Sequence, residues 1–582
     1  MIDRKEIAAA FEETAALLEL KGENPFKVKA YTQAARAILS VPGDLADLVT
    51  TGRVASVKGF GRTLAGHVAE LVTTGRLGLL VELRNHFPAG VLEMMQVPGL
   101  GPKKVKALYE DLGIKSLGEL EYACRENRLV TLKGFGAKTQ AKVLQGLEAL
   151  KKYRGRHLWA EVEHTALDLA AGLAGCPEVG RVELAGSFRR RKEIVKDLDL
   201  VAVSQSPAGA VECLEGLDLV EALTGGAETK FSFRLKTGLN ADLRLVPAES
   251  FAFAWHHFTG STEHNTQMRQ RAKTRGFKLN EYGLFDQAGR NVSPGIVLDE
   301  TGVFNLLDLP FIPPELREGL GEIEAAAAGR LPRLIEDKDI RGLFHVHSNY
   351  SDGGLTLADL IRHARALGYE YLGLSDHSRG AAYAGGLDLP ALDRQWAEVL
   401  ELRQGNPDFG LFWGIESDIL PDGSLDYPPQ VLARFDFILA SVHSHFSLTE
   451  KEMTARLVKA VQNPFTTILG HPTGRLLLAR EPYALDLPAV LAAAAEHGVA
   501  VEINANPHRL DLDWREMRRA KDLGLKTIIC PDAHSASGLQ DARYGVNAAR
   551  KGWLTQEDVI NSLSRMEMAR FLEARKRKAG AG

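Results

Sequence analysis

The sequence predicts a multidomain protein with a helical front third, a central α+β domain and a C-terminal parallel (β/α)7 barrel. Three observations support this. The chain has 582 residues, which is too long for one hydrophobic core. Apolar residues in the first third recur at helical spacing. After residue 340, seven short apolar runs alternate with amphipathic stretches, the pattern of repeated strand–helix units.

The composition is that of an ordinary globular protein, with 45% hydrophobic and 25% charged residues. No apolar run approaches the length of a membrane span, and the first residues lack the apolar core of a signal peptide. The four cysteines, at 124, 176, 213 and 530, show no paired or metal-like spacing. We therefore expect a cytoplasmic protein with buried free thiols and no membrane partner.

The charge is unevenly distributed. The net formal charge is −4, yet residues 1–155 carry 23 Lys and Arg against 17 Asp and Glu, an excess of +6. A basic segment suggests a polyanionic partner. A solvated helical surface explains an excess of this size equally well.

Helices are expected in the front third, and three near-copies of one glycine pattern lie between them: VKGFG at 57–61, VPGLG at 97–101 and LKGFG at 132–136. Two glycines permit a sharp hairpin, and the helix that follows offers free backbone N–H groups to a phosphate. A helix–helix corner would explain one copy, but three copies favour binding to the phosphates of a polyanion backbone without recognition of its sequence. The glycines are Gly59, Gly61, Gly99, Gly101, Gly134 and Gly136.

The central third is organised around GSFRRRKEIVKDLDL, residues 186–200. Strands are expected at 182–186 and 198–203, and residues two apart on a strand share a face, so Asp197 and Asp199 project together. Asp242, at the start of another strand, could join them. Three carboxylates on one face repel each other unless cations lie among them, and a pair of Mg²⁺ ions is the usual occupant.

Gly186 and Ser187 supply a tight turn, and the four basic residues at 189–192 follow it. This combination suits a triphosphate held while two metals drive an in-line displacement. A single D-x-D pattern is weak, because many strands end in solvated acids. The glycine–serine turn, the basic run and the two aspartates within fourteen residues are much more specific.

The last third predicts strands at 342–347, 371–375, 411–415, 436–442, 466–470, 500–503 and 527–530. Histidines and acids cluster where each strand stops, and parallel barrels collect their active sites at that end. Imidazole and carboxylate together suit Zn²⁺, Mn²⁺ or Fe²⁺, and clustered metals can clamp a phosphoryl group. The charged, Ala/Gly/Pro-rich segment before the barrel is expected to be a linker with some helix.

These motifs resemble known families. The three glycine patterns resemble helix-hairpin-helix DNA-binding motifs. Together with NPFKVKAYTQAARAI (24–38), the 186–200 motif and HFTGSTEHNTQMRQRAKTRGFKLNEYGLF (257–285), they resemble the family X DNA polymerases. The last third resembles a PHP (polymerase and histidinol phosphatase) domain. The resemblance implies an N-terminal helical domain (1–85), a fingers-like domain (86–155), a nucleotidyltransferase palm (156–250), a nucleotide-selecting subdomain (251–314), a linker (315–338) and a PHP domain (339–582).

The polymerase resemblance implies that Asp197 and Asp199 bind both catalytic metals, and that Asp242 binds the metal beside the primer 3′-OH and helps deprotonate it. The nucleotide-binding residues it implies are Gly186, Ser187, Arg190, Lys196, His257, Phe258, Gly260, Asn265 and Arg269. For Lys196 a solvent-facing role is the alternative, and for Asn265 and Arg269 an amphipathic helix surface.

In the N-terminal domain the resemblance implies that Lys27 and Lys29 hold a 5′-phosphate, with a solvated helix face as the alternative. The lysine that removes a 5′-deoxyribose phosphate in eukaryotic members falls at His67 here. Because imidazole cannot form the usual Schiff base, we expect no lyase activity by that route.

The PHP resemblance implies three metal positions. The ligands of the first are His345, His347, Glu416 and Asp532; of the second, Glu416, His443 and His471; and of the third, Asp352, His377 and His534.

The function implied is a monomeric DNA-directed DNA polymerase that fills short gaps in base-excision repair, using gapped or primer–template DNA and dNTPs. Mg²⁺ or Mn²⁺ would serve the polymerase site, and a three-metal cluster of Zn²⁺, Mn²⁺ or Fe would serve a 3′–5′ exonuclease that also acts on abasic sites or 3′-phosphates. One alternative is a non-templated nucleotidyltransferase joined to a small-molecule phosphoesterase. Another is a non-catalytic DNA-end-binding protein.

Overall fold

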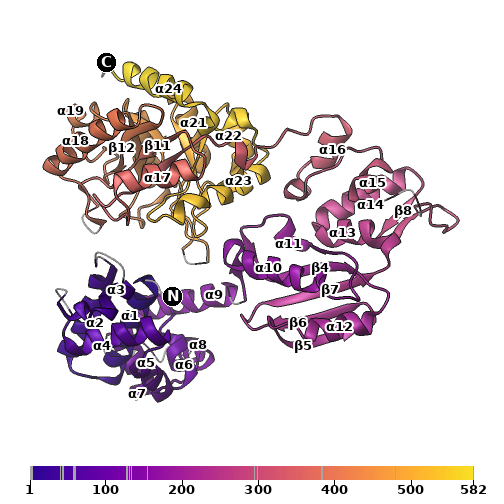
Figure 1. Ribbon diagram of the computed structural model, residues 1–582, viewed down its shortest axis with the longest axis horizontal. Coiled ribbons are helices and arrows are strands. Elements are labelled where there is room, and N and C mark those ends of the chain that lie inside the picture. The colour runs from indigo at the N-terminus through magenta and orange to yellow at the C-terminus, as the bar shows by residue number, and fades with distance from the viewer. Residues whose placement is uncertain are drawn as a thin grey trace. The chain divides into compact units, whose positions relative to one another are not determined.

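The computed structural model describes residues 4–580 except 40, 42–44, 57–59, 126–128, 130–131, 133, 154, 294, 296, 298, 382–383 and 479. The chain divides into two compact units, Met1–Arg154 and Gly155–Gly582 (Figure 1). Among the described residues, no helix combines the length and the apolar character that crossing a membrane requires.

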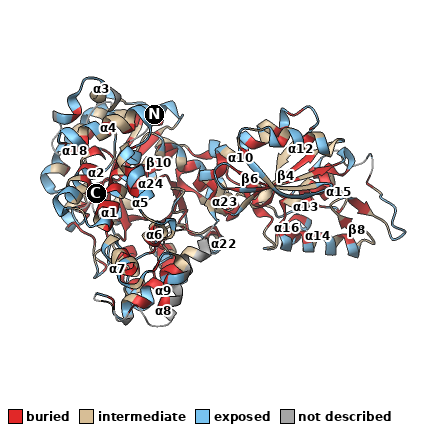
Figure 2. Ribbon diagram, turned by 90° about the horizontal axis from the view of Figure 1, so that it is seen from below, coloured by how far each residue is buried: buried red, intermediate tan, exposed pale blue. Residues whose placement is uncertain are grey.

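The first unit is helical, as the apolar spacing predicts. Its α-helices are α1 (Arg4–Lys21), α2 (Pro25–Leu39), α3 (Leu45–Thr50), α4 (Arg62–Thr74), α5 (Gly78–His86), α6 (Ala89–Met94), α7 (Pro102–Leu112), α8 (Leu117–Arg125) and α9 (Ala137–Tyr153). Each long helix buries one face in a shared apolar core and leaves the other to solvent (Figure 2).

The glycine patterns lie at helix starts. Gly99 and Gly134 have φ of +88° and +89°, a region that favours glycine. Gly101 caps the start of α7, Gly136 precedes α9 and Gly61 caps the start of α4. Gly59, the first glycine of the first pattern, is outside the described residues. The hairpins expected at Gly99 and Gly134 are therefore present.

The region expected to be a palm, called the palm below, contains a five-stranded sheet in the order β2-β4-β7-β6-β5. Its strands are β2 (Val182–Leu184), β4 (Asp197–Val203), β5 (Val220–Ala227), β6 (Lys230–Leu235) and β7 (Asn240–Val246), and β1 (His157–Leu158) pairs separately with β3 (Ile194–Val195). Leu198 and Leu200 enter the core with residues of α10 (Trp159–Ala174) and α12 (Pro207–Glu215). The alternation of a strand therefore turns Asp197 and Asp199 to the opposite face.

The next segment contains α13 (Phe251–Thr259), α14 (Thr262–Thr274), β8 (Lys278–Asn280), β9 (Gly283–Phe285), α15 (Glu300–Asn305) and α16 (Glu322–Ala327). The segment 315–338, expected as a linker with some helix, contains α16 and is packed into the fold, because Arg317 and Glu322 are fully buried. Arg317 pairs with Glu300, and Glu322 pairs with His264 of α14. Charged residues suggested solvent, but partners distant in the sequence bind them inside the fold.

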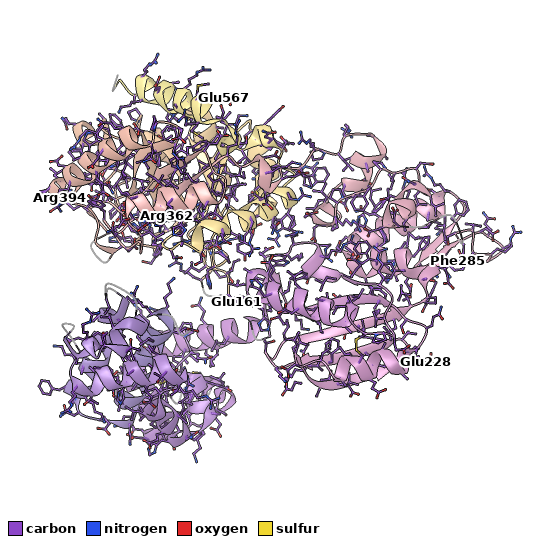
Figure 3. All side chains as sticks on the ribbon, in the orientation of Figure 1. Glu161, Glu228, Phe285, Arg362, Arg394 and Glu567 are labelled. Carbon is purple, nitrogen blue, oxygen red and sulfur yellow. A yellow bond between two sulfur atoms is a disulfide. The ribbon has the colours of Figure 1, made fainter. Side chains whose placement is uncertain are left out.

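The expectation of four free cysteines is wrong. A disulfide joins Cys176 to Cys213 across 37 residues (Figure 3). Cys176 lies just beyond α10 and Cys213 lies on α12, and both helices pack on one face of the sheet. Sequence spacing could not show that proximity. Cys124 and Cys530 are buried, as expected, and neither takes part in this disulfide.

The C-terminal domain is a nearly closed parallel barrel in the strand order β10 to β16. The strands are β10 (Gly342–Val346), β11 (Tyr371–Leu374), β12 (Gly410–Asp418), β13 (Phe437–Ser441), β14 (Thr466–Leu469), β15 (Ala500–Asn504) and β16 (Thr527–Cys530), all near their expected ranges. A parallel bridge between Val346 and Ala533 joins the two ends of the sheet. The predicted (β/α)7 barrel is confirmed.

Helices surround this sheet (Figure 1). They are α17 (Leu357–Ala366), α18 (Leu389–Gly405), α19 (Pro429–Leu432), α20 (Glu450–Gln462), α21 (Leu487–His497), α22 (Trp514–Asp522), α23 (Ala542–Lys551) and α24 (Arg565–Lys578). Met568 and Leu572 of α24 share an apolar cluster with Phe344, Tyr371 and Phe437 of the strands. This end of the barrel is therefore apolar, and the polar residues lie at the other end, where the strands have their carboxyl ends.

Replacing Arg317 by methionine is expected to lower the free energy of unfolding by about 3–5 kcal/mol, because Glu300 would stay buried with only part of its charge compensated. Arg317 donates to Glu300 at 2.5 Å, and Arg189 pairs with the same carboxylate at 2.6 Å. Denaturant titration measures the change. The control is Arg290→Met, which breaks an exposed pair with Asp286 and should cost about 1 kcal/mol or less. Equal losses in the two variants would contradict a structural role for Arg317.

Candidate active sites

The first candidate site is the acidic face of the palm sheet. Strands β4 and β7 pair in parallel with Asp199 opposite Asp242, and Asp197 lies two residues before Asp199. Burial, and then the charges of Asp197 and Asp242, raise the pKa of Asp199 to about 6. The three carboxylates singled out from the sequence therefore lie together, and their mutual repulsion is the condition that a bound cation would relieve.

Two further residues of this face were missed from the sequence. Ser232 donates a hydrogen bond to Asp242 at 2.5 Å, and the ammonium group of Lys230 lies 2.9 Å from the other oxygen of that carboxylate. Both come from β6, which pairs with β7 and places Ser232 opposite Asp242. The alternation in KFSFRL could have indicated them once β6 was assigned a place beside β7.

Gly186 lies directly against the acidic face. It opens a single helical turn, α11 (Gly186–Arg189), in place of the simple turn expected from the sequence. Its φ is +59°, and a Cβ atom built there would lie 1.9 Å from Oδ2 of Asp199. Glycine is therefore required both by the backbone conformation and by the approach of the carboxylate.

Replacing Gly186 by alanine is expected to reduce nucleotide addition about 100-fold or more, because the new methyl group must displace Asp199. Degradation of a 3′ end at the barrel should stay within about twofold of wild type, because the change is confined to the palm. The control is Gly238→Ala, at a φ of +84° with nothing within 4 Å of the added atom. If both variants lost addition equally, backbone strain and not the Asp199 contact would be responsible.

The basic residues after Gly186 are held by protein groups. Nη1 of Arg190 donates to the carbonyl of Thr259 at 2.5 Å, and Nε donates to Glu318 at 3.1 Å. Arg189 pairs with Glu300 and lies 3.4 Å from the centre of the Trp255 ring. Lys196 is exposed, next to Asp197, and Ser187 is half-buried. The charge of Arg190 partly offsets the rise in the pKa of Asp199, so Arg190 lies close to the acidic face and belongs to the same site.

The segment after the palm brings its residues beside this site. Gly260 packs against Arg190, since a Cβ there would lie 2.9 Å from Nη1. Asn265 is buried and its amide donates to the carbonyl of His257 at 2.7 Å, while Arg269 is exposed. Phe258 lies under the guanidinium of Arg244, 4.7 Å from the ring centre. Asn265 therefore lies on the buried face of α14, and Arg269 lies on its exposed face.

In the first unit, Lys27 and Lys29 lie exposed on α2. Lys27 is 3.6 Å from Glu23, and Phe26 beside it is 83% exposed. His67 of α4 is hydrogen-bonded through Nδ1 to the hydroxyl of Tyr31 at 2.9 Å, and burial lowers its pKa. The imidazole of His67, at the position of the family's lysine, is therefore in contact with Tyr31.

The second candidate site is a cluster of histidines and acids at the carboxyl ends of the barrel strands. Glu416 is its centre: Oε1 lies 3.1 Å from Nε2 of His443, 3.1 Å from Nε2 of His471 and 3.2 Å from Nε2 of His345. Burial opposes the ionisation of Glu416, yet the charges of His443 and His345 hold its pKa well below the usual range. All nine ligands expected from the sequence take part in this cluster, which consists of His345, His347, Asp352, His377, Glu416, His443, His471, Asp532 and His534.

The distances group these residues somewhat differently from the expectation. Ligand atoms within 4.8 Å of one another form four groups: His347, Asp352, His377 and His534; His345, His347 and Asp532; His345, Glu416 and His471; and His377, Glu416 and His443. His471 therefore lies with His345, and His377 lies with Glu416 as well as with Asp352. The groups overlap, as expected when several cations share bridging ligands.

Two carboxylates that orient this cluster were missed. Glu502 accepts a hydrogen bond from Nδ1 of His345 at 2.5 Å and another from the backbone N–H of His471. Asp418 lies 2.5 Å from Nδ1 of His443. A carboxylate at Nδ1 turns Nε2 toward a metal position. Both follow the period-two pattern of their strands, in GIESD and EINAN, which is the signal that could have identified them.

The cluster fits metal binding by a direct observation. Among the described residues, Nε2 of His345 and both ring nitrogens of His347 are buried without a well-aligned hydrogen-bond partner. Buried polar atoms of this kind require a partner. Facing carboxylates on neighbouring strands, they are suited to divalent cations.

Comparisons with known proteins match several regions of the chain. Models of a helix-hairpin-helix domain match residues 2–77, a SAM-like helix-hairpin-helix tandem 91–149, a DNA polymerase beta thumb 254–318 and a PHP domain 344–506. A probable phosphatase of Thermoanaerobacter sp. (strain X514) is 25% identical over 241 residues, which cover 39% of this chain and 91% of that protein.

The DNA polymerase/3′-5′ exonuclease PolX of Bacillus subtilis (strain 168) is 35% identical over 577 residues, which cover 98% of this chain and 99% of that protein. Similarity of this extent includes both candidate sites and both units. The chain therefore belongs to the PolX family, the family X DNA polymerases that carry a C-terminal PHP domain.

Proposed function

We propose that this protein adds nucleotides to a DNA 3′ end at the palm and removes them at the barrel. The observation that carries the proposal is the coexistence of two separate clusters suited to cations in one chain that also has helix-hairpin-helix modules. The name of the PolX relative includes both activities, DNA polymerase and 3′-5′ exonuclease. The domain limits proposed from the sequence (1–85, 86–155, 156–250, 251–314 and 339–582) assign each activity to its own part of the chain.

At the palm, Asp197 and Asp199 would hold two divalent cations, Mg²⁺ or Mn²⁺, and Asp242 would hold the one beside the primer 3′-OH. Bound there, the cations would supply Lewis acidity to the α-phosphate and neutralise the leaving pyrophosphate. Ser232 and Lys230 keep Asp242 oriented. Gly186, Ser187, Arg190 and Lys196 would line the triphosphate, and His257, Phe258, Gly260, Asn265 and Arg269 the nucleoside.

At the barrel, the nine ligands would hold a cluster of three cations, of which Zn²⁺, Mn²⁺ and Fe are the candidates. The cluster would supply a hydroxide nucleophile and clamp the terminal phosphodiester. Glu502 and Asp418 hold the histidine rings in the orientation that cation binding needs. The expected product is a shortened DNA 3′ end, and abasic sites and 3′-phosphates are further expected substrates.

The DNA partner proposed is a short gap, as arises in base-excision repair in the cytoplasm, with the protein acting as a monomer. Lys27 and Lys29 would contact the 5′-phosphate of the gap. The glycine patterns at 59–61, 99–101 and 134–136 would contact the DNA backbone without reading sequence.

The experiment is insertion opposite each of the four template bases in a one-nucleotide gap, with single dNTPs and Mg²⁺ or Mn²⁺. Templated gap filling predicts that the complementary dNTP is preferred at every template base. Insertion independent of the template would contradict it and favour a non-templated nucleotidyltransferase.

A further inference from the structure

A buried lysine of the barrel reaches the nucleotide-binding loop of the palm. Lys551, the last residue of α23, is 1% exposed. Its ammonium group donates to the carbonyl of Arg190 at 2.9 Å and to Oε1 of Glu318 at 2.5 Å. It also lies 4.6 Å from the centre of the Trp514 ring of α22. A lysine at the end of a surface helix normally extends into water, so its burial against another domain requires a compensating gain.

Glu318 joins this lysine to the palm. The same carboxylate accepts from Nε of Arg190 at 3.1 Å and lies 3.7 Å from Nζ of Lys192. Its side chain is 9% exposed, so these charges interact in a largely dehydrated environment. One carboxylate thus connects two cations of the glycine–serine loop with one cation of the barrel.

A second tie lies beside the first. Glu193, in the same loop, accepts hydrogen bonds from Nε1 of Trp514 at 3.1 Å and from Arg515 at 2.9 Å. Both donors belong to α22 of the barrel. The barrel therefore contacts both the carbonyl of residue 190 and the side chain of residue 193, three residues apart.

We propose that Lys551 and Glu318 are positioning residues of the polymerase reaction, through which the barrel holds the loop from Gly186 to Lys192 in place for the incoming triphosphate. Arg190 follows α11 directly, and Gly186 at the start of that turn touches Asp199. A displacement of the Arg190 carbonyl therefore moves Ser187 and the contact with the catalytic carboxylate. Pre-organisation of such a loop lowers the cost of binding its ligand.

This inference rests on the proposed polymerase activity and adds to it a role for the barrel that is independent of the barrel's metal cluster. Lys551 and Glu318 touch neither cluster; they act through Arg190. Their loss should therefore raise the KM for the dNTP more than it lowers kcat, and exonuclease activity should be unaffected.

The test compares Lys551→Met and Glu318→Gln with wild type in single-nucleotide gap filling by the full chain. Lys551→Met keeps the apolar stem in its buried site, and Glu318→Gln keeps the shape of the carboxylate. The matched control is Lys459→Met, which removes an exposed barrel lysine 3.1 Å from Asp422. We expect a KM increase of about tenfold in both test variants, a kcat within about threefold of wild type and no change in the control.

Exonuclease activity of each variant, measured in parallel, reports whether the barrel remains folded. Unchanged KM in Glu318→Gln, or a fall in kcat alone, would overturn the inference even if Lys551→Met failed to fold. If wild type itself adds no nucleotide, the proposed polymerase function fails, and that failure is distinct from equal KM values in active enzymes.

The pH profile gives an additional readout. Burial lowers the pKa of Lys551 to about 8, against the opposing charges of Glu318 and Glu193. The other groups that face it are the Arg190 carbonyl of the loop, the Glu315 carbonyl and the Trp514 ring of α22, while Lys192 and Arg515 contact its neighbours Glu318 and Glu193. Because this pKa is lowered, Lys551 loses its charge at a lower pH than an exposed lysine would, so the KM of wild type should rise between pH 7 and 9 more steeply than that of Lys551→Met. Parallel profiles of KM against pH for the two proteins would contradict the proposed action of Lys551 on the loop.

Discussion

Replacing Asp197 and Asp199 together by alanine is expected to reduce nucleotide addition by about a thousandfold or more, while 3′-end degradation stays within about twofold of wild type. These carboxylates share one face of the palm sheet with Asp242, and they are the ligands proposed for both polymerase cations. Without these two ligands the proposed cations would not be held, and their positive charge would no longer bring the triphosphate and the primer 3′-OH together. Gap filling and degradation of the same labelled primer measure the two rates.

The control for this variant is Asp218→Ala, which removes a fully exposed palm carboxylate paired with Lys236. It should leave both activities unchanged, because exposed pairs contribute little. Substantial nucleotide addition by the double variant would remove these two residues from the catalytic machinery. A parallel loss of degradation would show that the two sites are not independent.

Replacing His345 and His347 together by alanine is expected to have the reverse effect. Degradation should fall by about a thousandfold or more, because both side chains belong to overlapping ligand groups around Glu416 and Asp532. Nucleotide addition should stay within about twofold of wild type. Metal analysis of the purified protein should show loss of bound metal, since removing ligands weakens a shared cluster.

The matched control replaces His363 and His497, two histidines on the outer helices α17 and α21. This variant should retain its metal content and both activities. If degradation survived the loss of His345 and His347, the nuclease site would lie elsewhere in the chain. If addition fell together with degradation, the barrel cluster would also support the palm.

The sequence was sufficient where a local pattern determined the placement. The alternation of a strand puts Leu198 and Leu200 in the core, so Asp197 and Asp199 had to face the other side. The barrel ligands could be predicted because parallel strands end at one edge, and each strand end carries its own histidine or acid. In both cases the pattern lies within a few residues of the chemistry.

Prediction failed where placement depended on partners distant in the sequence. Arg317 and Glu322 were expected in a linker, but Glu300 and His264 bind them inside the fold. Glu502 was overlooked because its contact with His345 joins two strands that are 157 residues apart, and only its alternation within EINAN pointed to it. Lys551 could not be identified at all, since its partners come from the palm and the segment after it. The pairing of Cys176 with Cys213 likewise depends on how two helices pack on one sheet.

A single labelled primer at a one-nucleotide gap distinguishes a chain with two opposing activities from one with a single activity. The wild-type protein is incubated with Mn²⁺ and this substrate, with and without the complementary dNTP. We expect extension by one nucleotide when the dNTP is present and shortening of the same primer when it is absent. A primer that is extended but never shortened, or shortened under both conditions, would contradict the account that one chain carries both synthesis and degradation.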